Sequence, residues 1–257
     1  MPAPILTLTT DFGLADHYVG AMKGVILGIC PRARLVDISH QVTPFAIPEG
    51  AYTIAQAYRY FPRGTVHIVV VDPGVGSARR PILVEAAEQY FVAPDNGVLS
   101  LIFAREKHKV RLIASDRYFL KQVSATFHGR DIFAPVAAHL AKGISPSRIG
   151  KAIQDYLRPP FEKPRPTGNR AWSGNILKID RFGNIITNFR AEDFPAMDQL
   201  IIGRTRVRRM VGTYTEGRAG ELVAIAGSSG YLEVSVNQAS AAQKIGCASG
   251  DPCQIRV

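Results

Sequence analysis

An almost entirely apolar run, residues 66–71, ends at the carboxylate of Asp72. A short apolar run bounded by turn residues is typical of a strand that is buried on both faces of a sheet. The next residues include Gly74 and Gly76, which tolerate positive φ, so the chain can turn back sharply. The side chains of Asp72 and Arg79 can then point to one place, where a carboxylate and a guanidinium could hold a water molecule or a hydroxide ion.

Two other polar segments follow apolar or alternating runs. Residues 9–16 have the sequence TTDFGLAD, and residues 126–131 have the sequence TFHGRD. In open α/β sheets, ligands bind beyond the carboxyl ends of the strands, where the strand order switches. We therefore expect these loops and the Asp72 turn to form one site. For Asp16 and Asp131, a turn or a helix cap is an alternative interpretation.

The first 157 residues alternate between strand-like and helix-like segments. Strands are expected at 5–9, 35–38, 66–71, 81–86 and 90–93, and helices at 18–29, 48–60, 99–103 and 132–142, the last capped by Asp131. Near-continuous apolar strands separated by helices favour a mostly parallel sheet covered on both faces. We predict an N-terminal, mostly parallel α/β sandwich domain over residues 1–157.

Residues 158–170 are rich in proline, and we interpret them as an extended linker. In residues 171–257, short strands punctuated by glycine are expected at 173–179, 185–188, 199–202, 206–210, 222–226, 232–236 and 252–257. Strands at this spacing are typical of a small barrel or sandwich. The predicted second part is a C-terminal small β-barrel domain.

The net charge of +10 raises the hypothesis of a nucleic-acid partner, and the run RTRVRR at residues 204–209 is its best local support. The run alternates as an exposed strand does, and no aromatic residue lies among its arginines. A basic strand edge that resists pairing with another edge is the interpretation we favour. We expect no nucleic-acid partner and keep RNA binding as the alternative.

Metal, disulfide and membrane patterns are missing from the sequence. The three cysteines, Cys30, Cys247 and Cys253, include no C-x-x-C pair, and the six histidines include no pair at i and i+4. No apolar stretch approaches the ~20 residues that cross a bilayer, and the first residues lack the basic and apolar regions of a signal peptide. We expect a cytoplasmic protein with no metal and no membrane partner.

Six segments together resemble one enzyme family. They are TTDFG at 9–13, DPGVGSAR at 72–79, APDNG at 93–97, TFHGRDIFAP at 126–135, IDRFGNIITN at 179–188 and GSSGYLEVSVNQASAA at 227–242. Their order and spacing are similar to those of the SAM hydroxide adenosyltransferases, the S-adenosyl-L-methionine (SAM) hydrolases related to the SAM-dependent fluorinases and chlorinases. The resemblance covers nearly the whole chain.

The resemblance implies hydrolysis of SAM to adenosine and L-methionine, by in-line attack of water or hydroxide on the ribose C5′. It also implies an α/β domain with a C-terminal β-barrel, and a homotrimer with active sites between neighbouring subunits. SAM is the substrate, so no cofactor is expected. A SAM-dependent chlorinase or fluorinase, and a non-catalytic module that binds SAM or RNA, are the alternatives.

The family's catalytic residues match Asp72, Arg79 and His128. In this reading Asp72 accepts a hydrogen bond or a proton from water, while Arg79 and His128 stabilise hydroxide character on the oxygen. Which group takes the proton is left open. The related halogenases carry a neutral residue at the position of Asp72 and a serine at that of Gly129, so the resemblance favours hydrolysis.

Substrate-binding residues follow from the same matching. Asp11 matches the carboxylate that bonds the ribose hydroxyls, and Asp16 matches the residue that takes the methionine ammonium. Phe45 falls where the halogenases have a tryptophan, and it could pack either on the ligand or in the core.

The C-terminal part supplies the remaining matches. These are Asp180 and Asn184 at the methionine or ribose end, Phe182 against adenine, Ser228 and Ser229 at the methionine carboxylate, and Val236, Asn237 and Gln238 at the adenine edge, the last three through backbone groups. Ser229 stands where the fluorinases have an arginine.

Overall fold

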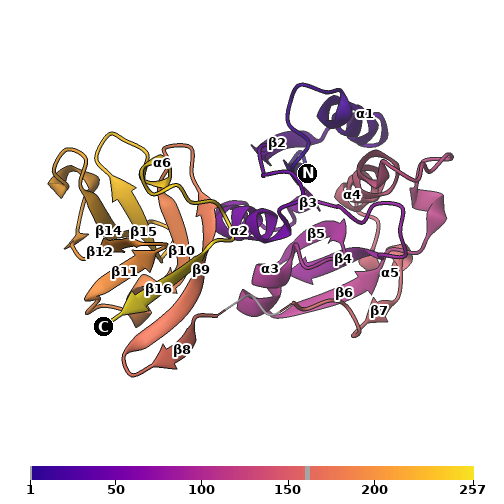
Figure 1. Ribbon diagram of the computed structural model, residues 1–257. Coiled ribbons are helices and arrows are strands. Elements are labelled where there is room, and N and C mark those ends of the chain that lie inside the picture. The colour runs from indigo at the N-terminus through magenta and orange to yellow at the C-terminus, as the bar shows by residue number, and fades with distance from the viewer. Residues whose placement is uncertain (1, 160–162) are drawn as a thin grey trace. The chain divides into compact units, whose positions relative to one another are not determined.

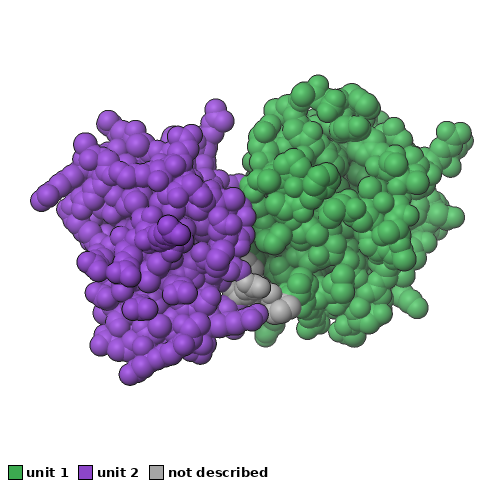
Figure 2. All heavy atoms as spheres, viewed as in Figure 1, with its two compact units in different colours: residues 1–159 green, residues 160–257 purple. Residues whose placement is uncertain are grey.

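The computed structural model describes residues 2–159 and 163–257. The chain divides into two compact units, residues 1–159 and 160–257 (Figure 2), and each unit has its own sheet and its own core. None of the helices in these described ranges has the length and hydropathy that crossing a membrane requires.

The first unit is built on a seven-stranded sheet in the order β2-β1-β3-β5-β4-β6-β7 (Figure 1). Its strands are β1 Ile5–Thr10, β2 Arg34–Ser39, β3 Val66–Val70, β4 Pro81–Ala86, β5 Gln89–Pro94, β6 His108–Leu112 and β7 Ala152–Ile153. The four strands β2, β1, β3 and β5 are parallel, whereas β4, β6 and β7 pair antiparallel.

Helices cover both faces of this sheet. They are α1 Tyr18–Ile29, α2 Ile47–Ala57, α3 Ser100–Arg105, α4 Ala134–Ala141 and α5 Pro146–Ile149. Helices α1 and α4 lie side by side (Figure 1) and share a core with the sheet, in which Leu6 and Ile68 meet Met22 and Val136. Helices α2 and α3 contact each other and are not part of that core.

The second unit is a nine-stranded sheet in the order β12-β11-β16-β9-β10-β15-β14-β13, with β8 paired to β9. Its elements are β8 Arg165–Gly168, β9 Ala171–Ile179, β10 Ile185–Arg190, β11 Gln199–Ile202, β12 Thr205–Val207, β13 Met210–Val211, β14 Leu222–Ala226, β15 Tyr231–Val236, α6 Ala241–Ile245 and β16 Pro252–Arg256. The end strands β12 and β13 are separated by only Arg208 and Arg209, so the sheet must curl into an incompletely closed barrel around one core.

The α/β class with a second, barrel-like part is confirmed, with several differences in detail. The parallel arrangement stops at β5, because the two-residue loop of Ala87 and Glu88 takes positive φ at both positions (51° and 58°), as a tight hairpin turn requires. The expected strand at 206–210 is two strands, β12 and β13, with different partners. Strands β6 and β7 and helix α6 were not predicted from the sequence.

The predicted linker at residues 158–170 overlaps a strand of the second unit. Residues 160–162 lie outside the described residues, and residues 165–168 form strand β8 of the second unit. The prolines at 164 and 166 do not prevent this pairing, because β8 pairs with β9 alone and a proline is tolerated on an edge strand.

A buried histidine, His67, ties three strands of the first sheet together. Its Nδ1 lies 2.7 Å from the hydroxyl of Thr7, its Nε2 lies 3.1 Å from Oε1 of Gln89, and its ring stacks on Phe91. Burial lowers the pKa of His67 to about 4, and the hydrogen bond with Gln89 offsets only part of that effect. The folded protein therefore holds His67 in its neutral form.

We expect His67 to make the protein less stable in acid. The folded form protonates His67 near pH 4 and the unfolded chain near pH 6.5, so the unfolded chain binds more protons between these values. The free energy of unfolding should fall by about 3 kcal/mol as the pH drops from 7 to 4 on account of this one group. Urea denaturation of the wild type and His67→Gln at several pH values measures the effect, and equal pH slopes for the two proteins would contradict it.

Candidate active site

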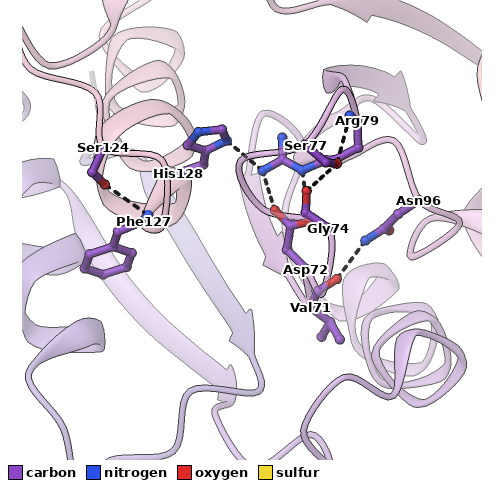
Figure 3. A network of polar contacts seen from close by, with 9 residues as sticks. All are labelled: Val71, Asp72, Gly74, Ser77, Arg79, Asn96, Ser124, Phe127 and His128. Carbon is purple, nitrogen blue, oxygen red and sulfur yellow. Dashed lines mark hydrogen bonds and ion pairs between the residues drawn. The ribbon is translucent and has the colours of Figure 1, made fainter.

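The chain leaves the buried strand β3 and enters the turn that carries Asp72. The amide of Asn96 donates to the carbonyl of Val71 at 2.8 Å and holds the end of the strand (Figure 3). Gly76 has φ 78°, and a Cβ built on it would lie 2.2 Å from the carbonyl oxygen of Ala125. Only glycine fits here, because both the backbone conformation and the close approach of the neighbouring loop exclude a side chain.

Asp72, Arg79 and His128 form one connected group (Figure 3). Arg79 Nε donates to Asp72 Oδ1 at 2.9 Å, and Arg79 Nη2 pairs with Asp72 Oδ2 and also donates to His128 Nδ1 at 2.8 Å. The side chains of Arg79 and Asp72 are 8% and 4% exposed. The structure thus joins the three predicted catalytic side chains, although His128 follows Arg79 by 49 positions in the chain.

This geometry fixes the protonation of His128. A guanidinium can only donate, so Nδ1 must accept and the proton of the neutral ring sits on Nε2. Burial lowers the pKa of His128, and the positive charge of Arg79 lowers it further. At neutral pH, His128 is therefore a neutral ring whose proton lies on Nε2.

Some donor and acceptor sites of this group have no partner among the described residues. Within the part of the chain that the structure describes, Arg79 Nη1 is buried and has no hydrogen-bond partner. Asp72 uses one lone pair on each oxygen for Arg79, and a carboxylate has about four such sites. A buried donor without a partner is costly unless water or a ligand engages it. The arrangement can therefore hold a polar oxygen between an acceptor and positively polarised donors.

A cavity of about 710 Å³ opens next to Asp72. Its lining comes from the end of β1, the start of α1 and three loops: Asp11, Phe12, His17, Tyr18, Pro44, Phe45, Asp72, Val75, Ser124, Thr126, Phe127 and Arg130. The volume is within the usual range for small-molecule sites. Of the three catalytic candidates, Asp72 lines the cavity, whereas Arg79, which contacts both Asp72 and His128, does not, and neither does His128.

The predicted ribose-binding residue Asp11 lies in this cavity. Its Oδ2 accepts the N–H of Phe45 at 2.9 Å. Burial raises the pKa of Asp11, and the charge of Asp72 raises it further, so the two carboxylates act on each other. Phe45 is 71% exposed at the rim and has φ 69°, which excludes the alternative that it packs in the core.

Asp16 and Asp131 do not cap helices. Asp16 is exposed and outside the cavity lining, and α1 begins after His17 without a side-chain cap. Asp131 lies inside a π-helix, Gly129–Phe133, so the expected cap of a helix at 132–142 is wrong. A π-helix places the chain one residue out of α-helical register, which is common at functional sites.

Asp131 instead holds the loop that carries His128. Its Oδ2 accepts the N–H and the hydroxyl of Ser124, each at 2.8 Å, and its Oδ1 accepts Arg130 Nε at 2.6 Å. Ser124 Oγ accepts the N–H of Phe127 at 3.0 Å (Figure 3). Burial alone would raise the pKa of Asp131, but the hydrogen bonds from Arg130 and Ser124 lower it below its usual value. The carboxylate is therefore charged, and it positions the loop.

In the second unit, the predicted residues fall into two groups. Asp180 accepts the N–H groups of Phe182 and Asn184 at 2.9 Å and the Asn184 amide at 2.8 Å, which closes the turn between β9 and β10. This turn lies beside the segment that follows β15, because the N–H of Ala242 donates to the carbonyl of Gly183 at 3.0 Å.

The adenine-edge prediction concerns that same segment, residues 236–238. The side chain of Val236 is in the core, and its carbonyl accepts the N–H of Ala239 at 3.3 Å. Asn237 donates to the carbonyl of Gly217 at 3.3 Å, and Phe182 is 78% exposed. Ser228 and Ser229 lie in the turn before β15, at the opposite end of that strand, so the unit does not bring them to Asn237.

Sequence reasoning missed several cavity residues: His17, Tyr18, Pro44, Ser124, Thr126 and Arg130. A partial signal existed, since His17 and Tyr18 directly follow Asp16, and Thr126 and Arg130 are part of the TFHGRD segment. The residue types alone do not indicate that these side chains bind a ligand. Tyr18 meets Phe12 and Phe127 edge to face at 5.9 and 5.1 Å, a contact that depends on how α1 packs.

The Asp72 turn yields a prediction with an internal control. Gly76→Ala should lower the free energy of unfolding by about 1–3 kcal/mol, because it forces a positive φ on alanine and a clash with Ala125. Gly74→Ala meets only atoms at 3.5 Å or more and should change stability by less than about 0.5 kcal/mol. Urea denaturation of both variants measures the difference. Similar stabilities for the two would show that the turn tolerates a side chain at position 76.

Comparison with known proteins shows which family the chain is similar to. The SAM hydroxide adenosyltransferase N-terminal domain matches residues 6–150, and the SAM hydroxide adenosyltransferase C-terminal domain matches residues 174–254. The (R)-S-adenosyl-L-methionine hydrolase of Salinispora tropica is 36% identical over 259 residues, which cover 99% of this chain and 98% of that protein. A fluorinase of an Actinoplanes species is 30% identical, over 93% of this chain and 94% of that protein.

A solved structure agrees with these sequence matches. The crystal structure of an uncharacterised conserved protein from Thermotoga maritima has a TM-score of 0.89 at 37% identity, over 98% of this chain and 100% of that chain. Both family domains match in order and together span most of the sequence. The chain therefore belongs to the SAM hydroxide adenosyltransferase family.

Proposed function

We propose that the protein hydrolyses (R)-S-adenosyl-L-methionine to adenosine and L-methionine by in-line attack of water or hydroxide on the ribose C5′. The observation that carries this proposal is the buried, connected group of Asp72, Arg79 and His128, with Asp72 at the wall of a cavity large enough for a nucleoside. The full-length similarity to a SAM hydrolase supports the choice of substrate.

The leaving group needs no catalytic assistance in this reaction. SAM carries a sulfonium, so methionine departs as a neutral thioether and needs neither an acid nor a cofactor. The site must instead hold an oxygen nucleophile in line with the C5′–S bond, and such alignment contributes up to about 7–11 kcal/mol in the best intramolecular cases.

The hydrogen bonds support Asp72 as the group that accepts the proton of water. Arg79 has no acceptor, and His128 uses Nδ1 for Arg79 and carries its proton on Nε2. Asp72 alone in this group keeps free lone pairs, and it alone lines the cavity. In the proposed mechanism Asp72 accepts the proton of the attacking water, while the charge of Arg79 and the neutral His128 stabilise the group as the proton moves.

Two features disfavour the halogenase alternative. A halide next to the carboxylate of Asp72 would be repelled at short range. A serine at position 129 is also crowded, because a Cβ built on Gly129 would lie 3.2 Å from Met22 Sδ and 3.3 Å from the ring of Phe127. The site has no neutral hydroxyl at that position to hold a halide.

The homotrimer, with active sites between neighbouring subunits, remains part of the proposal. It is supported by the family resemblance and by apolar side chains that a neighbour could cover: Leu14 is 65% exposed and Phe45 71% exposed in the first unit, and Phe182 is 78% exposed in the second. A location in the cytoplasm likewise stays a prediction from the sequence.

The reaction is tested by chromatography of SAM incubated with the purified protein, with and without chloride. The wild type should release adenosine and methionine in equal amounts and form no chlorinated nucleoside. Asp72→Asn keeps the shape but removes the charge and the proton acceptor, and should lower kcat at least about 100-fold. Intact SAM after incubation with wild type would reject the hydrolase and favour a binding module, and chloroadenosine would favour a halogenase.

Asp131 should act as a positioning residue. Asp131→Asn removes the charge and places an N–H₂ group against donors from Ser124 and Arg130, so the loop of His128 should shift and kcat/KM should fall about tenfold or more. Asp116→Asn changes an exposed carboxylate of the same unit and serves as the control. The loss should appear in kcat while the pH profile also changes, and a loss of thermal stability with unchanged kcat would reduce Asp131 to a structural role.

A further inference from the structure

The Asp72 loop, residues 72–79, joins two strands that are not neighbours in the first sheet. It leaves β3 and leads into β4, whereas the sheet order places β5 between these two strands. Because β3 runs parallel to β5 and β4 runs antiparallel to it, the loop crosses the carboxyl end of β5. Contacts outside the strand ladders must therefore hold the loop in place. Asp95 and Asn96, which directly follow β5 within the APDNG segment, make such contacts.

Asn96 holds the beginning of the loop. Its side-chain amide donates to the carbonyl of Val71 at 2.8 Å (Figure 3), and its Oδ1 accepts the N–H of Val98 at 3.1 Å. Both ends of the amide are engaged, so the side chain is held in one orientation. The carbonyl of Val71 belongs to the peptide group that joins it to Asp72. Asn96 therefore sets the direction in which Asp72 leaves the sheet.

Asp95 holds the end of the loop. Its N–H donates to the carbonyl of Arg80, the residue after Arg79, at 2.8 Å. Its Oδ2 accepts from Nε and Nη2 of Arg80 at 3.1 and 2.8 Å. The Asp95 side chain is only 3% exposed, and a buried carboxylate is costly unless it is paired. These bonds therefore fix the main chain from which Arg79 extends.

Asp95 is in turn tied to the last residues of the first unit. Its Oδ1 accepts the N–H of Leu157 at 2.8 Å. Arg80 Nη1 donates to Asp155 Oδ2 at 2.8 Å, and Arg80 Nη2 donates to the carbonyl of Asp155 at 2.6 Å. Both oxygens of the Asp95 carboxylate are thus engaged, so Asp95 gives the end of the loop a fixed support.

Neither Asp95 nor Asn96 lines the cavity, so each can act on the reaction only through the loop. We propose that Asp95 and Asn96 are positioning residues, which hold the two ends of the Asp72 loop so that Asp72 meets Arg79 and the attacking water. A displacement of about 1 Å at a reacting group can cost about 100-fold in rate. This inference rests on the proposed hydrolysis of SAM and gives the APDNG segment a role in it.

The test is a double-mutant cycle between Asn96 and Asp72. Asn96→Asp keeps the shape and the acceptor for Val98, but it replaces the donor to Val71 by a carboxylate oxygen that the carbonyl repels. It should lower kcat about tenfold or more and change KM less than about threefold. In the Asp72→Asn background the same change should lower kcat less than about twofold, because the group that Asn96 positions is already inactive.

A second variant and a matched control complete the design. Asp95→Asn removes the charge that pairs with Arg80 and should give the same pattern as Asn96→Asp in both backgrounds. Glu85→Gln removes the partner of Arg111, whose Nε donates to Glu85 Oε1 at 2.8 Å, near the other end of β4. It also breaks an arginine–carboxylate pair of the first sheet, and it should leave kcat and KM as in the wild type.

Each outcome decides the inference. A loss of kcat that disappears in the Asp72→Asn background supports it. No loss, a loss in KM alone, or the same loss in both backgrounds overturns it, because a merely structural role would act whether or not Asp72 is present. If Asn96→Asp does not fold, as judged by thermal melting, Asp95→Asn decides by the same cycle.

Failure of the proposed function is a separate result. If the wild type fails to turn over SAM, the hydrolase proposal fails, and crystal structures of the wild type and Asn96→Asp decide the positioning role. Loss of the hydrogen bond between Arg79 Nε and Asp72 Oδ1 in the variant alone supports that role. A pair that is the same in both structures overturns it.

Discussion

The buried ion pair between Asp72 and Arg79 is the interaction on which the candidate active site depends. Removing two charges from water costs several kcal/mol per ion and is recovered only when the geometry is good and the remaining donors and acceptors are used. Here the guanidinium makes two hydrogen bonds to Asp72 and a third to His128. The two residues are joined by a turn in which Gly76 takes a positive φ of 78°. Arg79 therefore joins Asp72 to His128, and its hydrogen bond to Nδ1 leaves the proton of the neutral ring on Nε2.

A buried polar atom that lacks a partner lies in the candidate active site. Among the described residues, Arg79 Nη1 is such an atom. By contrast, the buried His67 is satisfied on both ring nitrogens, as a purely structural polar group should be. A buried donor without a protein partner is costly, so Arg79 Nη1 is a position that water or a ligand can complete.

Much of the fold could be predicted from the sequence because apolar runs and turn residues act locally. Strands such as β1 and β14 and helix α1 are found within a residue or so of their expected bounds. Strand β8 was hidden by its prolines, which are tolerated only because it lies at an edge. The break between β12 and β13 was not predicted, although the adjacent Arg208 and Arg209 end the alternation there, and the two strands pair with different partners.

The sequence alone determined the class of fold and pointed to Asp72, Arg79 and His128 as one group. Periodicity, turn residues and the resemblance of six short segments can all be read from neighbouring residues in the sequence. Only the tertiary structure decided that His128 Nδ1 accepts from Arg79, that Phe45 is exposed, and that Ser228 and Ser229 lie at the far end of β15 from Asn237. These facts depend on contacts between segments far apart in sequence. Packing determines such contacts, and no local pattern records which side chains it brings together.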